Sequence, residues 1–268
     1  MTDRLPNFSI DITPDSVSRW MFGRDGVLPN SPPADGDEVP LSYLFFLRSQ
    51  PAACISIHRE LGRDPDRGLF GGVHYDRHRG IKVGDRLNAS AAVTARKTVA
   101  SPRGDMLLTT LVTSWRVQNT DAVTETVRMI DLPPGPAAAP IAGPAADTAL
   151  PPLGAPVAFS RTQITWLTVQ TGDMNPLHLD RDYATSREFP DVVVPGTLIV
   201  PVAEQKLVTA TGHALQTLDA RFRAPTFPGE EIVVSGAPDE ATGAWRFELS
   251  GSGTVRAVGT ATFGAGVA

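Results

Sequence analysis

Apolar residues recur along the chain with two different periods, one typical of strands and one typical of helices. From residue 73 onward, β-branched residues and alternating polarity predict four strands, at 73–79, 86–99, 106–117 and 122–130. Turn signals such as Gly84-Asp85 separate these strands. A second group of four strands is predicted at 215–223, 231–237, 244–250 and 255–263. The pattern therefore indicates two groups of antiparallel strands.

A segment with helical character precedes each group of strands. Residues 40–49 are apolar on all sides, which is typical of a buried helix, and residues 197–211 predict a longer apolar helix. Shorter helices are expected at 180–188 and from Thr13, the predicted N-cap, to a stop at Gly23. One buried helix followed by antiparallel strands is the outline of a hot-dog fold, in which a sheet wraps around a central helix.

The two groups are separated by residues 131–156, which are dominated by Pro, Ala and Gly and have no hydrophobic period. Such a segment cannot bury a core, so we expect a linker that is either an extended strap over the surface or disordered. Residues 75–87 align weakly with residues 220–232, which supports an internal duplication. The prediction is an α+β double hot dog, with domains 1–130 and 157–268 whose sheets join into one.

Composition narrows the classes of function. The chain has 268 residues, 20% of them charged and 41% hydrophobic, and a net charge of −5 gives no reason to expect nucleic acid or an anionic membrane as a partner. Cys54 is the single cysteine, so a disulfide within the chain and a metal site built on cysteines are excluded, and a reducing cytoplasm fits. Neither a signal peptide nor an apolar run of about 20 residues is found.

Residues 159–180 carry the strongest chemical signal. A helix is predicted with Thr162 as its N-cap and Gly172 at its end, and Pro176 prevents it from continuing. Asp173 and His178 are then held together on a tight loop, an arrangement that suits acid–base chemistry. The alternative is that Asp173 caps the next turn and that His178 is a loop histidine without a catalytic role.

The string Thr171-Gly172-Asp173-Met174-Asn175-Pro176-Leu177-His178 closely resembles the signature of the MaoC-like, type 2 (R-specific) enoyl-CoA hydratases and dehydratases. The resemblance implies that Asp173 and His178 are the catalytic pair of a hot-dog enzyme, without a cofactor or a metal. The first half resembles the N-terminal domain of two-domain members such as mesaconyl-CoA hydratases and hydroxyacyl-thioester dehydratases. The implied reaction is reversible hydration of a trans-2-enoyl thioester to an R-3-hydroxyacyl thioester.

The resemblance also implies a donor for the thioester carbonyl at the start of the long helix. The family's usual His-Gly is Pro195-Gly196 here, and Pro195 has no N–H, so Gly196 is the first candidate and Thr197 the next. Asn175 is expected to brace the loop. The implied partner is an acyl-CoA or acyl-carrier-protein thioester, in a chain that is not inserted in a membrane and could form a homodimer.

The first half has no counterpart of this motif, so we expect it to shape the acyl pocket without catalysing the reaction. Its histidines, His58, His74 and His78, are interpreted as surface or hydrogen-bonded residues. The aromatic residues of the buried helix are expected to pack in the core, with one of them available to line the pocket: Tyr43, Phe45 and Phe46.

Two other functions are compatible with the sequence. A hot-dog thioesterase would place a carboxylate on the central helix, where Glu204 is found, although without a supporting motif. A lyase or pocket protein recruited to a specialised pathway, with a changed substrate, is the other alternative. The sequence does not identify the acyl group, the carrier, the direction of the reaction or which of Asp173 and His178 is the base.

Overall fold

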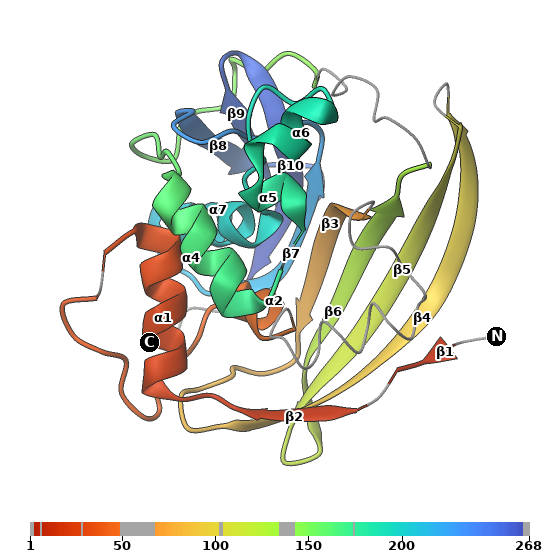
Figure 1. The fold of residues 1–268 in the computed structure, drawn as a ribbon. Coiled ribbons are helices and arrows are strands. Elements are labelled where there is room, and N and C mark those ends of the chain that lie inside the picture. The colour runs from red at the N-terminus through yellow and green to blue at the C-terminus, as the bar shows by residue number, and fades with distance from the viewer. Residues whose placement is uncertain are drawn as a thin grey trace.

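The strands form one large antiparallel sheet (Figure 1). The computed structural model describes residues 3–5, 7–27, 29–48, 68–101, 104–133, 143–173 and 175–264. Within these residues the sheet order is β1-β4-β5-β6-β3-β7-β10-β9-β8, and β2 pairs with β4. The strands are β1 (Asp3–Arg4), β2 (Phe8–Asp11), β3 (Gly68–Arg77), β4 (Arg86–Ser101), β5 (Gly104–Val117), β6 (Thr120–Asp131), β7 (Leu215–Phe222), β8 (Ile232–Pro238), β9 (Trp245–Gly251) and β10 (Thr254–Phe263).

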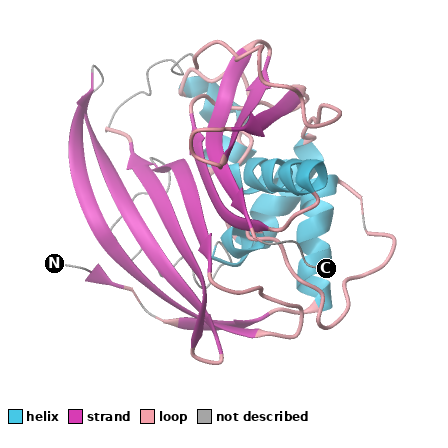
Figure 2. Ribbon diagram, turned by 180° about the vertical axis from the view of Figure 1, so that it is seen from behind, coloured by secondary structure: helices cyan, strands magenta, loops and turns pink. Residues whose placement is uncertain are grey.

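The helices lie together on one face of this sheet, which curves around them (Figure 2). They are α1 (Pro14–Asp25), α2 (Tyr43–Arg48), α4 (Arg161–Thr171), α5 (Pro176–Leu179), α6 (Arg181–Ser186) and α7 (Gly196–Thr211). All six residues of α2 are buried, as the apolar segment 40–49 predicted. Among the described residues, none of the helices is long and apolar enough to cross a membrane.

Two predicted helix boundaries were wrong. Helix α1 begins after the predicted cap Thr13 but continues through Gly23 and ends at Gly26, whose φ is 74°. Gly23 does not stop the helix because its missing side chain makes room for Leu167 of α4, which lies 3.2 Å from where a Cβ would be. Helix α4 is capped by Ser160 and not by Thr162, since Ser160 and Gln163 form a capping box. Its end at Gly172 is as predicted.

The two halves repeat the same strand order, which confirms the predicted fold. In the first half β3 pairs with β6 at one side of the β4-β5-β6 meander, and in the second half β7 pairs with β10 in the same way. The weak sequence alignment matches Tyr75 with Ala220 and therefore Val73 with Leu218. Under a twofold rotation that exchanges the halves, the observed pair Val73–Ala220 becomes the observed pair Tyr75–Leu218. The fold is a double hot dog with a twofold relation between its halves.

The contact between β3 and β7, which we call the β3–β7 seam, joins the halves into one sheet. Gly72 lies on this seam with a φ of 153°, a conformation that side chains disfavour. A Cβ on Gly72 would also lie 2.3 Å from the carbonyl oxygen of Ala220. The close approach of the two strands at this point therefore requires glycine.

The described part of the predicted linker runs along the edge of the second half. Leu153 donates its N–H to the carbonyl of Val234, and Val157 and Ile232 exchange two backbone hydrogen bonds. Ala146 donates its N–H to Gly253 at the turn between β9 and β10. Residues 151–157 thus follow the outer edge strand β8, whereas residues 144–146 pair with the start of β10 and the turn before it. Pairing of this kind protects an exposed strand edge. Residues 134–142 lie outside the described residues.

The central helix of the second half caps the central helix of the first half. Glu204 of α7 is 4% exposed, and its carboxylate accepts the N–H groups of Leu41 and Ser42, each at 2.8 Å, and the hydroxyl of Ser42. These donors lie directly before α2, where helix N–H groups have no partner within the helix. Burial raises the pKa of Glu204, and the hydrogen bonds from Ser42 and Leu41 oppose that rise.

We expect Glu204→Ala to destabilise the fold by about 2–5 kcal/mol, because it leaves two or three buried donors without an acceptor. Glu204→Gln keeps one acceptor oxygen and should lose less. Urea unfolding of the two variants and the wild type measures the difference. Equal midpoints for all three proteins would mean that the cap of α2 contributes nothing to stability.

Candidate active site

The loop that carries Asp173 and His178 is held by its own polar groups. Gly172 ends α4 with a left-handed φ of 66°, and Asn175 caps the short helix α5 by accepting the N–H of Leu177 at 3.0 Å. Pro176 occupies the first position of α5, where a missing N–H costs nothing. Asp173 Oδ1 accepts the N–H of Asn175 at 3.3 Å. The residue that caps α5 is therefore Asn175 and not Asp173.

The imidazole of His178 is fixed in orientation. Its Nδ1 lies 2.7 Å from the carbonyl oxygen of Val193, and a carbonyl can only accept, so Nδ1 carries the proton. The other ring nitrogen, Nε2, faces Asp173 Oδ2 at 3.8 Å. That distance is too long for a direct hydrogen bond but allows both atoms to contact one small molecule such as water. The side chains of His178 and Asp173 are 14% and 34% exposed, so the pair is accessible from one side.

The segment that holds His178 leads directly into α7. Val193 also donates its own N–H to the carbonyl of Leu177, so the two segments are joined in both directions. Two residues further on, Pro195 is the N-cap of α7 and has no side chain that could accept from the first turn. The N–H groups of Gly196 and Thr197 thus stand at the positive end of a 16-residue helix. Thr197 is 5% exposed, and its hydroxyl has no partner among the described residues.

The first half contributes one wall of this site. Asn175 Nδ2 donates to the carbonyl of Gly68, the first residue of β3, at 3.1 Å. Phe70 of the same strand lies against Gly196, so that a Cβ on Gly196 would meet its ring at 2.6 Å. Phe45 of α2 stacks on Phe70 with ring centroids 4.4 Å apart. Gly68 and Phe70 escaped the sequence analysis because the glycine-rich start of β3 has no clear alternation.

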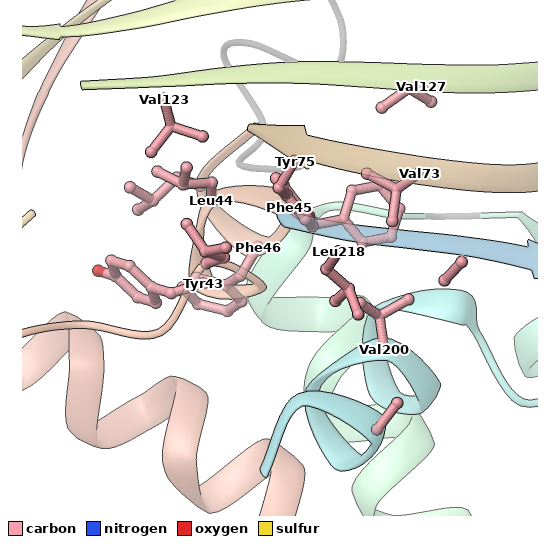
Figure 3. Packing of buried hydrophobic residues seen from close by; sticks show 14 of the residues in the cluster. Tyr43, Leu44, Phe45, Phe46, Val73, Tyr75, Val123, Val127, Val200 and Leu218 are labelled. Atoms are coloured by element: carbon pink, nitrogen blue, oxygen red, sulfur yellow. The ribbon is translucent and has the colours of Figure 1, made fainter. Parts of the chain in front are cut away.

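The aromatic residues of α2 all pack in the interior, as expected for most of them. Tyr43 is fully buried, stacks on Phe46 and lies 2.6 Å from the hydroxyl of Ser16. Figure 3 shows both residues within the packed interior. Burial raises the pKa of Tyr43 to about 12, so it stays neutral. Phe45 is the member of α2 that reaches the wall beside Gly196, through Phe70.

The remaining candidates have other partners. His74 Nδ1 lies 3.7 Å from Asp219 Oδ2, and His78 Nε2 lies 3.0 Å from the hydroxyl of Thr124. The residues between 49 and 67, including His58, Cys54 and three arginines considered as phosphate ligands, lie outside the described residues. In the described part of the chain, no group of three His, Cys, Asp or Glu side chains could hold a metal ion.

Comparison with known proteins agrees with this geometry. Residues 147–256 match the family model described as a MaoC like domain, which covers the strap, the Asp173–His178 loop, α7 and most of the following strands. No curated protein is similar enough to count as a relative. Over residues 147–256 the chain is therefore similar to MaoC like domains.

Several solved structures have the same fold as the whole chain. HtdX of Mycobacterium tuberculosis superposes with a TM-score of 0.71 at 22% identity, over 98% of this chain and all of that one. A second Mycobacterium tuberculosis protein, described as a double hot dog, superposes with 0.60 at 13% identity over 97% and 96% of the two chains. An acyl-ACP thioesterase from Bacteroides thetaiotaomicron does so with 0.57 at 8% over 97% and 98%. Identities this low establish the shared fold and leave the activity to be argued from the site.

The hydrogen bond from Asn175 Nδ2 to the carbonyl of Gly68 can be tested with two substitutions of Asn175. Asn175→Ala removes both the cap of α5 and the hydrogen bond to β3, and it should reduce the free energy of unfolding by about 1–3 kcal/mol. Asn175→Asp keeps an acceptor for Leu177 but turns an oxygen toward the carbonyl of Gly68. If the hydrogen bond to Gly68 stabilises the fold, the Asp variant should melt at or below the temperature of the Ala variant. A wild-type melting temperature for Asn175→Asp would show that Asn175 acts as a cap alone.

Proposed function

We propose that this protein is a hydro-lyase that adds water reversibly to a trans-2-enoyl thioester and forms an R-3-hydroxyacyl thioester. The observation that carries the proposal is the pair of Asp173 Oδ2 and His178 Nε2, 3.8 Å apart and within the residues that match the MaoC like domain. The R configuration of the product rests on the resemblance of the loop motif. The carrier of the acyl group is CoA or an acyl carrier protein.

The tautomer of His178 supports a role as the base in this reaction. With Nδ1 donating to Val193, a neutral His178 presents an unprotonated Nε2, which can take a proton from a water molecule. Asp173 Oδ2 accepts a hydrogen bond from the second O–H of the same water, which stays on the oxygen, and so orients the water. The hydroxide adds to C3 of the enoyl group, and the proton taken up by the pair returns to C2, so that one molecule of water is added in balance.

The N-terminus of α7 supplies the electrophilic assistance. As the hydroxide adds, negative charge moves to the thioester oxygen, and a backbone N–H at a helix N-terminus stabilises that charge without reorganising. Gly196 is the proposed donor. Thr197, whose buried hydroxyl has no partner among the described residues, is the proposed second contact. Asn175 holds the loop and does not touch the substrate.

A thioesterase is the competing function, since the fold is shared with a solved thioesterase. Its catalytic carboxylate would have to be Glu204. That carboxylate is buried and accepts hydrogen bonds from Leu41 and Ser42. Both carboxylate oxygens of Glu204 therefore already accept hydrogen bonds from the backbone before α2. This argues against a role for Glu204 in thioester hydrolysis.

The proposal predicts that Asp173→Asn and His178→Ala each reduce turnover by about 10²–10⁴, the usual contribution of a general acid or base. The loss of enoyl absorbance from crotonyl-CoA or a longer trans-2-enoyl-CoA measures turnover. Thermal unfolding within a few degrees of wild type is the control for folding. Near-full activity in either variant would remove that residue from the mechanism, and release of free thiol by the wild type would favour the thioesterase.

A second prediction concerns the carbonyl donor. Gly196→Val should reduce kcat by roughly 10²–10³, the cost of losing one oxyanion donor, because the new side chain overlaps the ring of Phe70 and moves the N–H away from the substrate carbonyl. Pro195→His should leave kcat within about tenfold, since Pro195 has no N–H to lose. Phe70→Leu is the matched control for crowding, because it changes the ring against Gly196 and leaves the N–H in place.

Two results with the variants at the start of α7 would contradict the proposed carbonyl donor. If Gly196→Val turns over at the wild-type rate, the N–H of Gly196 does not polarise the carbonyl. If Pro195→His abolishes activity while the fold is retained, the loop before α7 acts in a different way from the one proposed.

A further inference from the structure

The inner face of the first half carries a row of polar side chains that the proposed reaction does not use. Tyr75 of β3, Glu125 of β6 and Thr113 of β5 stand directly opposite one another on three neighbouring strands. All three are fully buried. The row on one side is apolar, with Val73, Val127 and Leu111, and in the row on the other side Val123 lies opposite Arg77 and Trp115. We call Tyr75, Glu125, Thr113 and Arg48 the polar row, because Arg48 of α2 reaches Glu125.

The polar row has too few hydrogen-bond partners for its burial. Glu125 Oε2 accepts from Trp115 Nε1 at 3.3 Å and lies 3.3 Å from Arg48 Nε. The Tyr75 hydroxyl faces the Glu125 carboxylate and interacts with it electrostatically. Among the described residues, four groups of the row nevertheless have no partner at hydrogen-bond geometry: Glu125 Oε1, the hydroxyls of Tyr75 and Thr113, and Arg48 Nη2. Each such buried group costs about 1–3 kcal/mol, so four together point to a polar ligand that is bound here at some stage.

A continuous line of aromatic contacts leads from the polar row to the proposed active site. The Arg48 guanidinium lies over the ring of Phe45 at 4.4 Å, Phe45 stacks on Phe70, and Phe70 lies against Gly196. Figure 3 shows Phe45 and Tyr75 in the interior between α2 and the sheet. The five residue steps from Phe70 to Tyr75 span on the order of 17 Å of strand. An acyl chain that takes this path displaces the two phenylalanine rings, and its far part reaches the polar row.

The charges and hydrogen-bonding groups of the polar row define the ligand. Arg48 and Glu125 neutralise each other, so the row as a whole attracts no ion. Its free groups are a donor on Arg48, an acceptor on Glu125, and two hydroxyls that can act as either. A neutral group that both donates and accepts satisfies them, whereas a plain alkyl chain leaves all four unpaired.

We infer that the first half selects the acyl group and that its polar row binds a hydroxyl group carried on the acyl chain far from the thioester. The inference rests on the proposed function, since it assumes that the thioester lies at Gly196. It assigns the substrate class as chain-hydroxylated acyl thioesters, distinct from the C3 hydroxyl that the reaction itself forms.

The test uses pairs of trans-2-enoyl-CoA substrates, from hexenoyl to hexadecenoyl, with and without a hydroxyl at the chain end. At the chain length that reaches the polar row, wild type should have a kcat/KM about tenfold or more higher for the hydroxylated member, the value of one good hydrogen bond. Tyr75→Phe and Thr113→Val remove single hydroxyls with little change of shape. Each should reduce this preference several-fold and leave turnover of the plain chain unchanged or faster.

Binding separates this inference from the proposed function. Calorimetry with saturated acyl-CoA pairs, with and without the terminal hydroxyl, should show the same preference in wild type and its loss in Tyr75→Phe. If calorimetry finds the preference but no enoyl-CoA is hydrated, the proposed function is wrong, and the inference that the polar row binds a chain hydroxyl is supported. If wild type shows no preference for a hydroxyl at any chain length, or keeps it in both variants, the inference is wrong.

Stability gives an independent readout. If the polar row awaits a ligand, Tyr75→Phe and Thr113→Val remove unpaired polar atoms, and the melting temperature of the unliganded protein should stay the same or rise. A fall of several degrees in both variants would show that these hydroxyls serve the folded structure itself, and would contradict a ligand role.

Discussion

The antiparallel pairing of β3 with β7 is the contact on which the rest of the molecule depends. It can form only because Gly72 lets the backbone of β3 approach the carbonyl of Ala220, where any side chain would overlap. Pairing at this seam joins the sheets of the two hot-dog halves into one sheet. It also brings α2 and α7 onto the same face of that sheet (Figures 1 and 2). The buried contact of Glu204 with the start of α2 follows from that arrangement.

The candidate site is a second consequence of the seam. The second half supplies the groups proposed to do chemistry, on a loop braced by Asn175 and at the start of α7. The first half supplies the carbonyl of Gly68 and the ring of Phe70, both on β3. A duplication followed by loss of the motif in one copy would leave this division: one half keeps the reacting groups, and the other is free to adapt its interior to the acyl chain. Under the inference drawn above, the buried polar row is an adaptation of that kind.

The sequence predicted the parts of this structure that depend on local patterns. The eight long strands, the two central helices and the left-handed end of α4 at Gly172 were all found close to their predicted places. The errors came from tertiary contacts. The residue type of Gly23 predicts a helix stop, but Gly23 lies inside α1, where α4 packs closely against it.

The site could be predicted only in part, for the same reason. The motif places Asp173 and His178 on one loop, but the contact that orients His178 is a backbone carbonyl, which leaves no signal in the residue type of Val193. The wall formed by Phe70 depends on pairing between strands that are separated by more than a hundred residues. A bulge between Phe70 and Gly72 also interrupts the alternation that would have marked the start of β3.

The most direct test of the account is a crystal structure of His178→Ala with an R-3-hydroxyacyl-CoA. The account predicts the C3 hydroxyl beside Asp173, in the space left by the imidazole. It predicts the thioester oxygen within about 3 Å of the N–H of Gly196, and an acyl chain that passes Phe70 into the first half. A thioester oxygen bound to other donors, or an acyl chain that leaves the site without entering the first half, would contradict it.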